Sequence, residues 1–197
     1  MTVEGPLMRI CRALLCVTAV FAFAITVHAA PFVVFPKAGQ LSSPDRRFVV
    51  RNSDREAPFS EYVGTFHFLF LEDTASGRSR KLCDYVGVAA VAWAKNDLII
   101  VTQYVSKYAA RALVFVADDS RDPVVIDKPL LTNLLPINLR PQLRENDHVF
   151  VEASRVEGEM LTLRVWGYGR HDAKGFRWRC KYSLLEGGIH CEETNRP

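Results

Sequence analysis

The histidines are the first residues of this chain to consider for metal or acid–base chemistry. Beyond the N-terminal segment they are His67, His148, His171 and His190. No two of them have the spacing of a zinc motif such as H-x-x-x-H or H-E-x-x-H. The group formed by His190, Cys191 and the two glutamates that follow can contact a metal, but a solvated tail beside a disulfide is the simpler interpretation. The sequence therefore predicts no metal site and no cofactor.

A run of acidic and hydroxyl side chains at residues 118–122 is the second candidate, in this case for calcium. It lacks the glycine and the distal glutamate of an EF-hand loop, so we expect an acidic β-turn there. The chain holds no G-x-S-x-G, P-loop or G-x-G-x-x-G motif, and no spacing among its Ser, His and Asp residues defines a catalytic triad. No catalytic residue is predicted, which favours a protein that is not an enzyme.

A basic and aromatic stretch near the C-terminus is the best candidate for binding. Such a surface can bind an anionic glycan, a lipid head group or an acidic protein. The alternative is structural, with aromatic rings in the core and Arg and Lys on a wet face that protects an edge strand. The predicted binding residues are Arg164, Trp166, Tyr168, Arg177, Trp178 and Arg179, with Arg170, Lys174, Phe176 and Lys181 around them.

The N-terminal segment has the pattern of a secretory signal peptide. Arg9 and Arg12 form its basic region, residues 13–27 its apolar region, and Val27-His28-Ala29 offers a cleavage site. We therefore expect residues 1–29 to be a signal peptide, with the signal forming a helix, and the rest of the protein to be periplasmic or secreted. Such a compartment permits disulfides.

Two alternatives to this signal peptide stay open. Met8 is a second possible start of the chain. The uncharged run 13–30 just reaches the lower length limit of a membrane span, so an uncleaved anchor would be the protein's one contact with a membrane.

The chain has 25 Lys+Arg against 22 Asp+Glu, a formal net charge of +3. This balance does not demand nucleic acid as a partner, and export argues against one.

Three cysteines follow the signal, namely Cys83, Cys180 and Cys191. An odd number allows at most one intramolecular bridge. Cys180 with Cys191 is the favoured pair, because it would tie down the C-terminal tail. A two-residue hairpin at Gly187-Gly188 would set Cys191 opposite Leu184, so this pair needs a longer loop. Cys83 is then a free, buried thiol.

A repeat of about 50 residues organises the rest of the chain. Asp45, Asp97 and Asp147 each precede a matching apolar strand, which is followed by a second strand, a polar turn and a shorter strand. Residues 88–127 show the unit most completely, and four strands at this period are typical of propeller blades. We therefore predict an all-β fold of about three four-stranded antiparallel propeller-like sheets, a partial β-propeller, in a single domain over residues 30–197. The strands expected within residues 88–127 lie at 88–92, 97–104, 111–117 and 123–127.

Three segments do not fit the repeat. Residues 128–135 are predicted as the one short helix, because Asp127 can cap it and Pro129 suits its first turn. Residues 137–146 are predicted as a loop that leads into the third unit. Residues 30–41 are expected to be either a strand that closes a sheet or a packed arm.

Residues 43–50, Ser-Pro-Asp-Arg-Arg-Phe-Val-Val, resemble the Ser-Pro-Asp-Gly motif and apolar strand of TolB-like, WD40-like propeller repeats. Residues 70–82 look like the strand–turn–strand that follows, and residues 90–93 like the first strand of the next blade. Arg46 stands where the family usually has Gly, and the later units lack Ser-Pro-Asp. The resemblance, best over residues 43–97, implies periplasmic protein binding. Since propellers usually have four or more blades, it also implies a partial propeller, a stacked antiparallel sheet derived from one, or a module completed by another chain, including a second copy.

These observations favour an exported, non-enzymatic protein-binding module of the cell envelope. One alternative is a small envelope carbohydrate-binding protein or a glycan-acting hydrolase whose acid pair the sequence does not locate. Another is a secreted inhibitor or immunity-type protein. The expected partner is an envelope protein or an anionic glycan.

Overall fold

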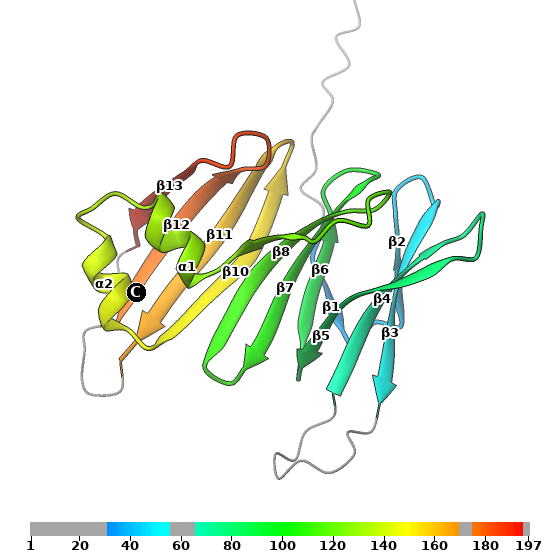
Figure 1. The fold of residues 1–197 in the computed structure, drawn as a ribbon, viewed down its shortest axis with the longest axis horizontal. Helices are drawn as coiled ribbons and strands as arrows, with labels where there is room; N and C mark the ends of the chain where they lie inside the picture. The colour runs from blue at the N-terminus through cyan, green and yellow to red at the C-terminus, as the bar shows by residue number, and fades with distance from the viewer. Residues whose placement is uncertain (1–30, 56–65, 170–174, 195–197) are drawn as a thin grey trace, which may run out of the picture.

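The computed structural model describes residues 31–55, 66–169 and 175–194. Within these ranges the chain forms thirteen β-strands and two short helices (Figure 1). The expectation of an all-β fold is confirmed. The predicted signal peptide, residues 1–29, lies outside the described residues. Among the residues that are described, no helix has both the length and the apolar character needed to cross a membrane.

A four-stranded antiparallel sheet forms the N-terminal part. The Ser43-Pro44-Asp45 turn fixes its first hairpin, because the Ser43 hydroxyl donates to Asp45 at 2.6 Å and accepts from the Phe48 amide at 3.0 Å. Arg46 follows with a φ of 61°, in the left-handed region that favours glycine. In order, the strands are β2 (Gln40–Ser42), β3 (Phe48–Arg55), β4 (Phe66–Asp73) and β5 (Ser79–Val86).

The other nine strands form one larger sheet. Its path begins with β1 (Val33–Phe35), β6 (Ala89–Trp93), β7 (Leu98–Ser106) and β8 (Ala109–Val116), with β9 (Val124–Ile126) also paired to β8. It continues through β10 (His148–Glu157), β11 (Met160–Tyr168), β12 (Phe176–Ser183) and β13 (Ile189–Glu193).

The expectation of three separate sheets is wrong in one respect. The second and third units are joined, because the start of β10 pairs in parallel with the start of β8, Val149 with Ala109 and Phe150 with Ala110. Of the two alternatives for residues 30–41, the structure supports a strand, but the segment forms two short strands instead of one: β1 pairs with β6 in the large sheet and β2 with β3 in the small one.

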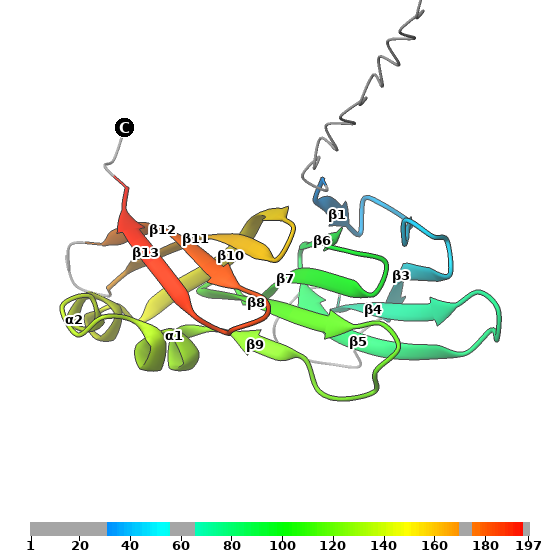
Figure 2. The ribbon, with the colours of Figure 1, turned by 90° about the horizontal axis from the view of Figure 1, so that it is seen from above.

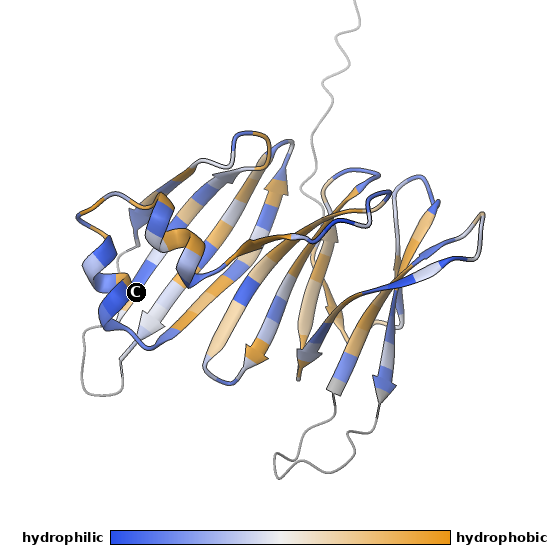
Figure 3. Cartoon of the chain, in the orientation of Figure 1, coloured by the Kyte–Doolittle hydropathy of each residue, from blue (hydrophilic) through white to orange (hydrophobic). Residues whose placement is uncertain are grey.

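Two apolar cores hold the elements together. The first lies between the small sheet and one face of β6–β8, and the second lies between β10–β12, the helices and the other face of β7 and β8. Successive side chains of β7 alternate between them: Ile99 and Val101 belong to the first core and Ile100 to the second. Burial on both faces accounts for the apolar run at residues 98–101, where this strand begins. Figure 3 shows how β11 and β12 instead alternate between hydrophobic and hydrophilic residues.

Two helices cover one face of the C-terminal half of the large sheet. The first, α1 (Lys128–Leu134), lies where it was predicted, and Asp127 caps it by accepting from the Leu130 amide at 3.0 Å. The second, α2 (Arg140–Glu145), occupies the segment predicted as a loop. That prediction was wrong because Pro141 lies in the first turn, where its missing N–H costs nothing, and Leu143 is buried. Figures 1 and 2 show both helices on the same side of β10–β12.

Candidate functional site

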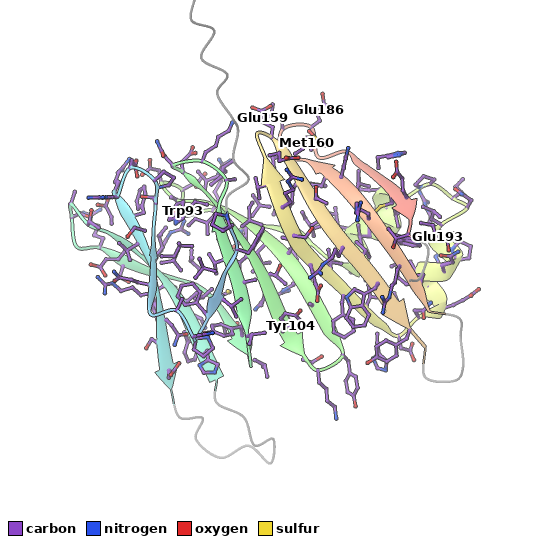
Figure 4. All side chains as sticks on the ribbon, turned by 180° about the vertical axis from the view of Figure 1, so that it is seen from behind. Trp93, Tyr104, Glu159, Met160, Glu186 and Glu193 are labelled. Carbon is purple, nitrogen blue, oxygen red and sulfur yellow. A yellow bond between two sulfur atoms is a disulfide. The ribbon has the colours of Figure 1, made fainter. Side chains whose placement is uncertain are left out.

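The other side of β10–β12, which Figure 4 shows from behind, is not covered by the helices. The outward-pointing residues of β11 and β12 include most of the predicted binding residues. Alternation along β11 sends Leu161, Leu163 and Val165 into the core, so the residues between them point outward. On β12 the arginines point outward in the same way. We call this surface the open face; it consists of His148, Phe150, Glu152, Arg164, Trp166, Tyr168, Arg177 and Arg179.

Trp178 does not belong to the open face, although it was predicted as a binding residue. It is 2% exposed and lies in the second core, where its ring is 4.1 Å from that of Phe176. The correction follows from the period of two in a strand, because Trp178 lies between two outward-pointing arginines and must point the opposite way. Arg170 and Lys174, also considered for binding, lie outside the described residues.

A continuous stack of rings crosses the open face. Phe150 and Trp166 are nearly parallel, with centroids 3.9 Å apart and an interplanar angle of 5°. Tyr168 lies 6.2 Å from Phe150 and 6.1 Å from Trp166, and His148 lies between Tyr168 at 4.7 Å and Tyr108 at 4.5 Å. Aromatic rings at such distances attract one another beyond the burial of their area. The stack therefore fixes the orientation of Trp166.

Glu152 is a buried carboxylate at the margin of this stack, with 9% of its surface exposed. One of its oxygens accepts a hydrogen bond from the Tyr104 hydroxyl, which comes from β7. The other lies 3.0 Å from the Arg164 guanidinium. Burial, and then the hydrogen bond to Glu152, raise the pKa of Tyr104, so the phenol stays protonated and donates. Both oxygens of Glu152 are thus engaged, and Arg164 is held in place.

A shallow hollow of about 350 Å³ lies beside Trp166. Arg164 and Arg179 face each other directly across β11 and β12, an arrangement that is unfavourable for like charges. The side chains of Arg177 and Arg179 have no ion-pair partner within the described ranges. Glu192, opposite Arg179 on β13, lies instead 3.6 Å from His190. The residues that line the hollow are Glu152, Arg164, Val165, Trp166, Arg177, Trp178, Arg179 and Thr194.

The sequence did not indicate Tyr104, Tyr108, His148, Phe150 or Glu152 as part of a site. Phe150 and Glu152 come from β10, and the two tyrosines come from β7 and the turn that follows it. One signal was available in the sequence, since Gly158 favours a turn and a turn there brings β10 beside β11. That signal indicates that the two strands are neighbours, but it does not indicate which residues lie opposite each other. Their register depends on an irregularity between Ala153 and Arg155.

The predicted disulfide and the predicted free thiol are both confirmed. Cys180 and Cys191 lie opposite each other on β12 and β13 and form a disulfide. The connection between these strands covers residues 184–188, longer than a two-residue turn, and Gly187 adopts a φ of 70° in it. Cys83 is a free, buried thiol, and its burial raises its pKa to about 12.

The remaining candidates have ordinary partners. Asp118 binds Arg47 through two hydrogen bonds of 2.6 and 2.9 Å, and Asp119 binds Arg121, so these carboxylates of the 118–122 cluster are paired. His67 is buried on β4, with its Nδ1 2.6 Å from Asp54.

Chemically, the open face is suited to holding an anion against an aromatic ring. Within the described part of the chain, no group of three or more His, Cys, Asp and Glu side chains is arranged to hold a metal ion. The hollow is lined by a single carboxylate, Glu152.

No protein-family model matches this chain, and no curated protein matches its sequence.

Proposed function

We propose that this protein is an exported, non-enzymatic binding module of the cell envelope, which holds a protein partner on its open face. The observation that carries the proposal is a rigid stack of aromatic rings, flanked by arginines, on the side of β10–β12 that the helices leave bare. Trp, Tyr and Arg are the residue types that contribute most of the energy in protein–protein interfaces. The export part of the proposal depends on the signal pattern of residues 1–29.

The preorganisation of the open face supports binding. Trp166 is fixed by its stack on Phe150, and Arg164 is fixed by Glu152. Side chains that are already ordered lose little conformational entropy when a partner arrives. More of the contact energy is then retained as affinity.

The single carboxylate of the hollow favours binding over glycan hydrolysis. Glycosidases generally use two carboxyl groups, one on either side of the bond that is cleaved. Here Glu152 stands alone, and both of its oxygens are bonded to neighbouring side chains. The stack also uses one face of the Trp166 ring for Phe150, which leaves less aromatic surface for a sugar.

The proposal includes a partial propeller of the TolB-like type as the scaffold. What supports it is the succession of three four-stranded units, β2–β5, β6–β9 and β10–β13, each built from consecutive strands. Phe48 on β3 and Ile99 on β7 are both buried in the first core, whereas Phe150 on β10 is buried against Trp166 on the open face. Binding of proteins is what the resemblance to such repeats implies for the chain.

Site-specific photo-crosslinking in the native cells tests the function. A benzophenone amino acid is placed at Tyr168, on the open face and 38% exposed, and in a matched variant at Ile137, which is 80% exposed and follows α1. We expect one discrete protein adduct from position 168 and none from position 137. Equal adducts from both positions, or none from position 168, would contradict the proposal.

A further inference from the structure

We propose that the hollow beside Trp166 is a carboxylate-binding subsite, in which Arg177 and Arg179 bind an aspartate or glutamate of an acidic segment in the partner. This inference rests on the proposed function and specifies the chemistry of the partner. It makes Trp166 the neighbouring contact for an apolar side chain of the same segment.

The charges around the hollow do not balance. Three guanidinium groups and one carboxylate line it, and that carboxylate, Glu152, is already bonded to Arg164 and Tyr104. Arg177 and Arg179 have no ion-pair partner among the described residues. Glu192, which lies opposite Arg179 on β13, is 3.6 Å from His190 and forms no ion pair with that arginine. The subsite therefore presents two arginines without an ion pair to an incoming group.

The geometry of the two arginines suits a carboxylate. They are two positions apart on β12 and point to the same side, so their Cα atoms are roughly 7 Å apart. A guanidinium group presents a planar fork of donors that matches the two oxygens of a carboxylate. An anion between them also offsets the repulsion between Arg179 and Arg164, which lies directly across from it.

The hollow favours an acidic peptide over an anionic glycan. A sugar brings many hydroxyl donors, and these need acceptors. The one carboxylate of the hollow has both oxygens occupied, and the Thr194 hydroxyl already donates to the carbonyl of Arg177. A carboxylate side chain brings only acceptors, which match the free donors of the two arginines.

Binding of capped hexaglutamate to the full chain with its disulfide intact tests the inference, with capped hexaglutamine and polygalacturonate as the other probes. Titration calorimetry at low salt should detect hexaglutamate binding, which weakens as salt screens the charges. The double variant Arg177→Gln/Arg179→Gln should raise the dissociation constant about tenfold or more. The matched control is Arg144→Gln, an exposed arginine of α2 on the helix side, which should bind as the unchanged protein does.

Stability separates binding from a structural role. Because Arg179 opposes Arg164 without an ion pair of its own, the double variant should unfold at the same urea concentration as the unchanged protein or at a higher one. If it binds less tightly only because it unfolds more easily, the subsite is refuted. Equal hexaglutamate affinity in the double variant and the unchanged protein also refutes it, as does an equal loss in the Arg144→Gln control.

The remaining outcomes separate this inference from the proposed function. Binding of polygalacturonate but not of hexaglutamate overturns the acidic peptide as ligand. A protein adduct at position 168 that persists in the double variant leaves the binding function standing and overturns the carboxylate subsite. Arginine-dependent binding of hexaglutamate without any protein adduct supports the subsite and contradicts a protein partner.

Discussion

Phe150 and Trp166 lie directly opposite each other on β10 and β11, with their rings stacked 3.9 Å apart. A stacked pair of this kind is worth about 0.5–1.5 kcal/mol beyond the area that it buries. We expect a double-mutant cycle of Phe150→Leu and Trp166→Leu, measured by urea unfolding, to give a coupling energy of about 1 kcal/mol. Additive effects of the two substitutions would show that the rings do not support each other.

Tyr104 is expected to stabilise the fold through Glu152. Removing a hydroxyl that donates to a buried carboxylate leaves that group short of a partner, at a cost of about 1–3 kcal/mol. Tyr104→Phe should therefore lower the free energy of unfolding by this amount. Tyr108→Phe, at an exposed ring, is the control and should change it by less than about 0.5 kcal/mol. Equal effects of the two substitutions would contradict the role given to Glu152.

Gly167 allows a close approach beneath the open face. A Cβ atom there would lie 2.5 Å from the Phe176 ring and 2.8 Å from the backbone oxygen of His148. We expect Gly167→Ala to destabilise the protein by about 1–3 kcal/mol, because the strand must shift. The control is Gly188→Ala, where a Cβ atom meets nothing within 4 Å. Thermal unfolding of both variants checks the prediction, which fails if Gly167→Ala melts no earlier than its control.

Asp54 should make stability depend on acid pH. The hydrogen bond with His67, and then the one from Asn52, lower the pKa of the Asp54 carboxyl in the folded state. The carboxylate thus stabilises the fold above its unfolded pKa of about 3.9, and this contribution is lost as the pH falls through the lowered folded value. Unfolding free energies measured between about pH 5 and pH 2 should fall less steeply in Asp54→Asn than in the unchanged protein. Parallel curves would contradict the assignment.

The alternation of residues predicted much of this structure. On β12 the sequence alone separates Phe176 and Trp178 from Arg177 and Arg179, and applying that period strictly would have removed Trp178 from the predicted site. The strands of residues 88–127 and the helix capped by Asp127 were also predictable, because each depends on local signals.

The aromatic stack was not predictable in this way. An unbroken hairpin through Gly158 would place Phe150 opposite Gly167, on the core side of the sheet. The register shift between Ala153 and Arg155 moves it by one position and brings it opposite Trp166. A single extra residue in β10 therefore decides which face carries the ring of Phe150.

The hydrogen bond between Tyr104 and Glu152 joins two units of the chain. It depends on how β10 lies against β7, and no local sequence pattern indicates that arrangement.

The bond between Cys180 and Cys191 has a consequence for association between molecules. Strand β13 ends the path of the large sheet and is held covalently to its neighbour β12. Proteins often form swapped dimers or open filaments by exchanging a terminal strand. An oxidised molecule cannot lend β13 to another copy, so polymerisation by that route would first require a reductant.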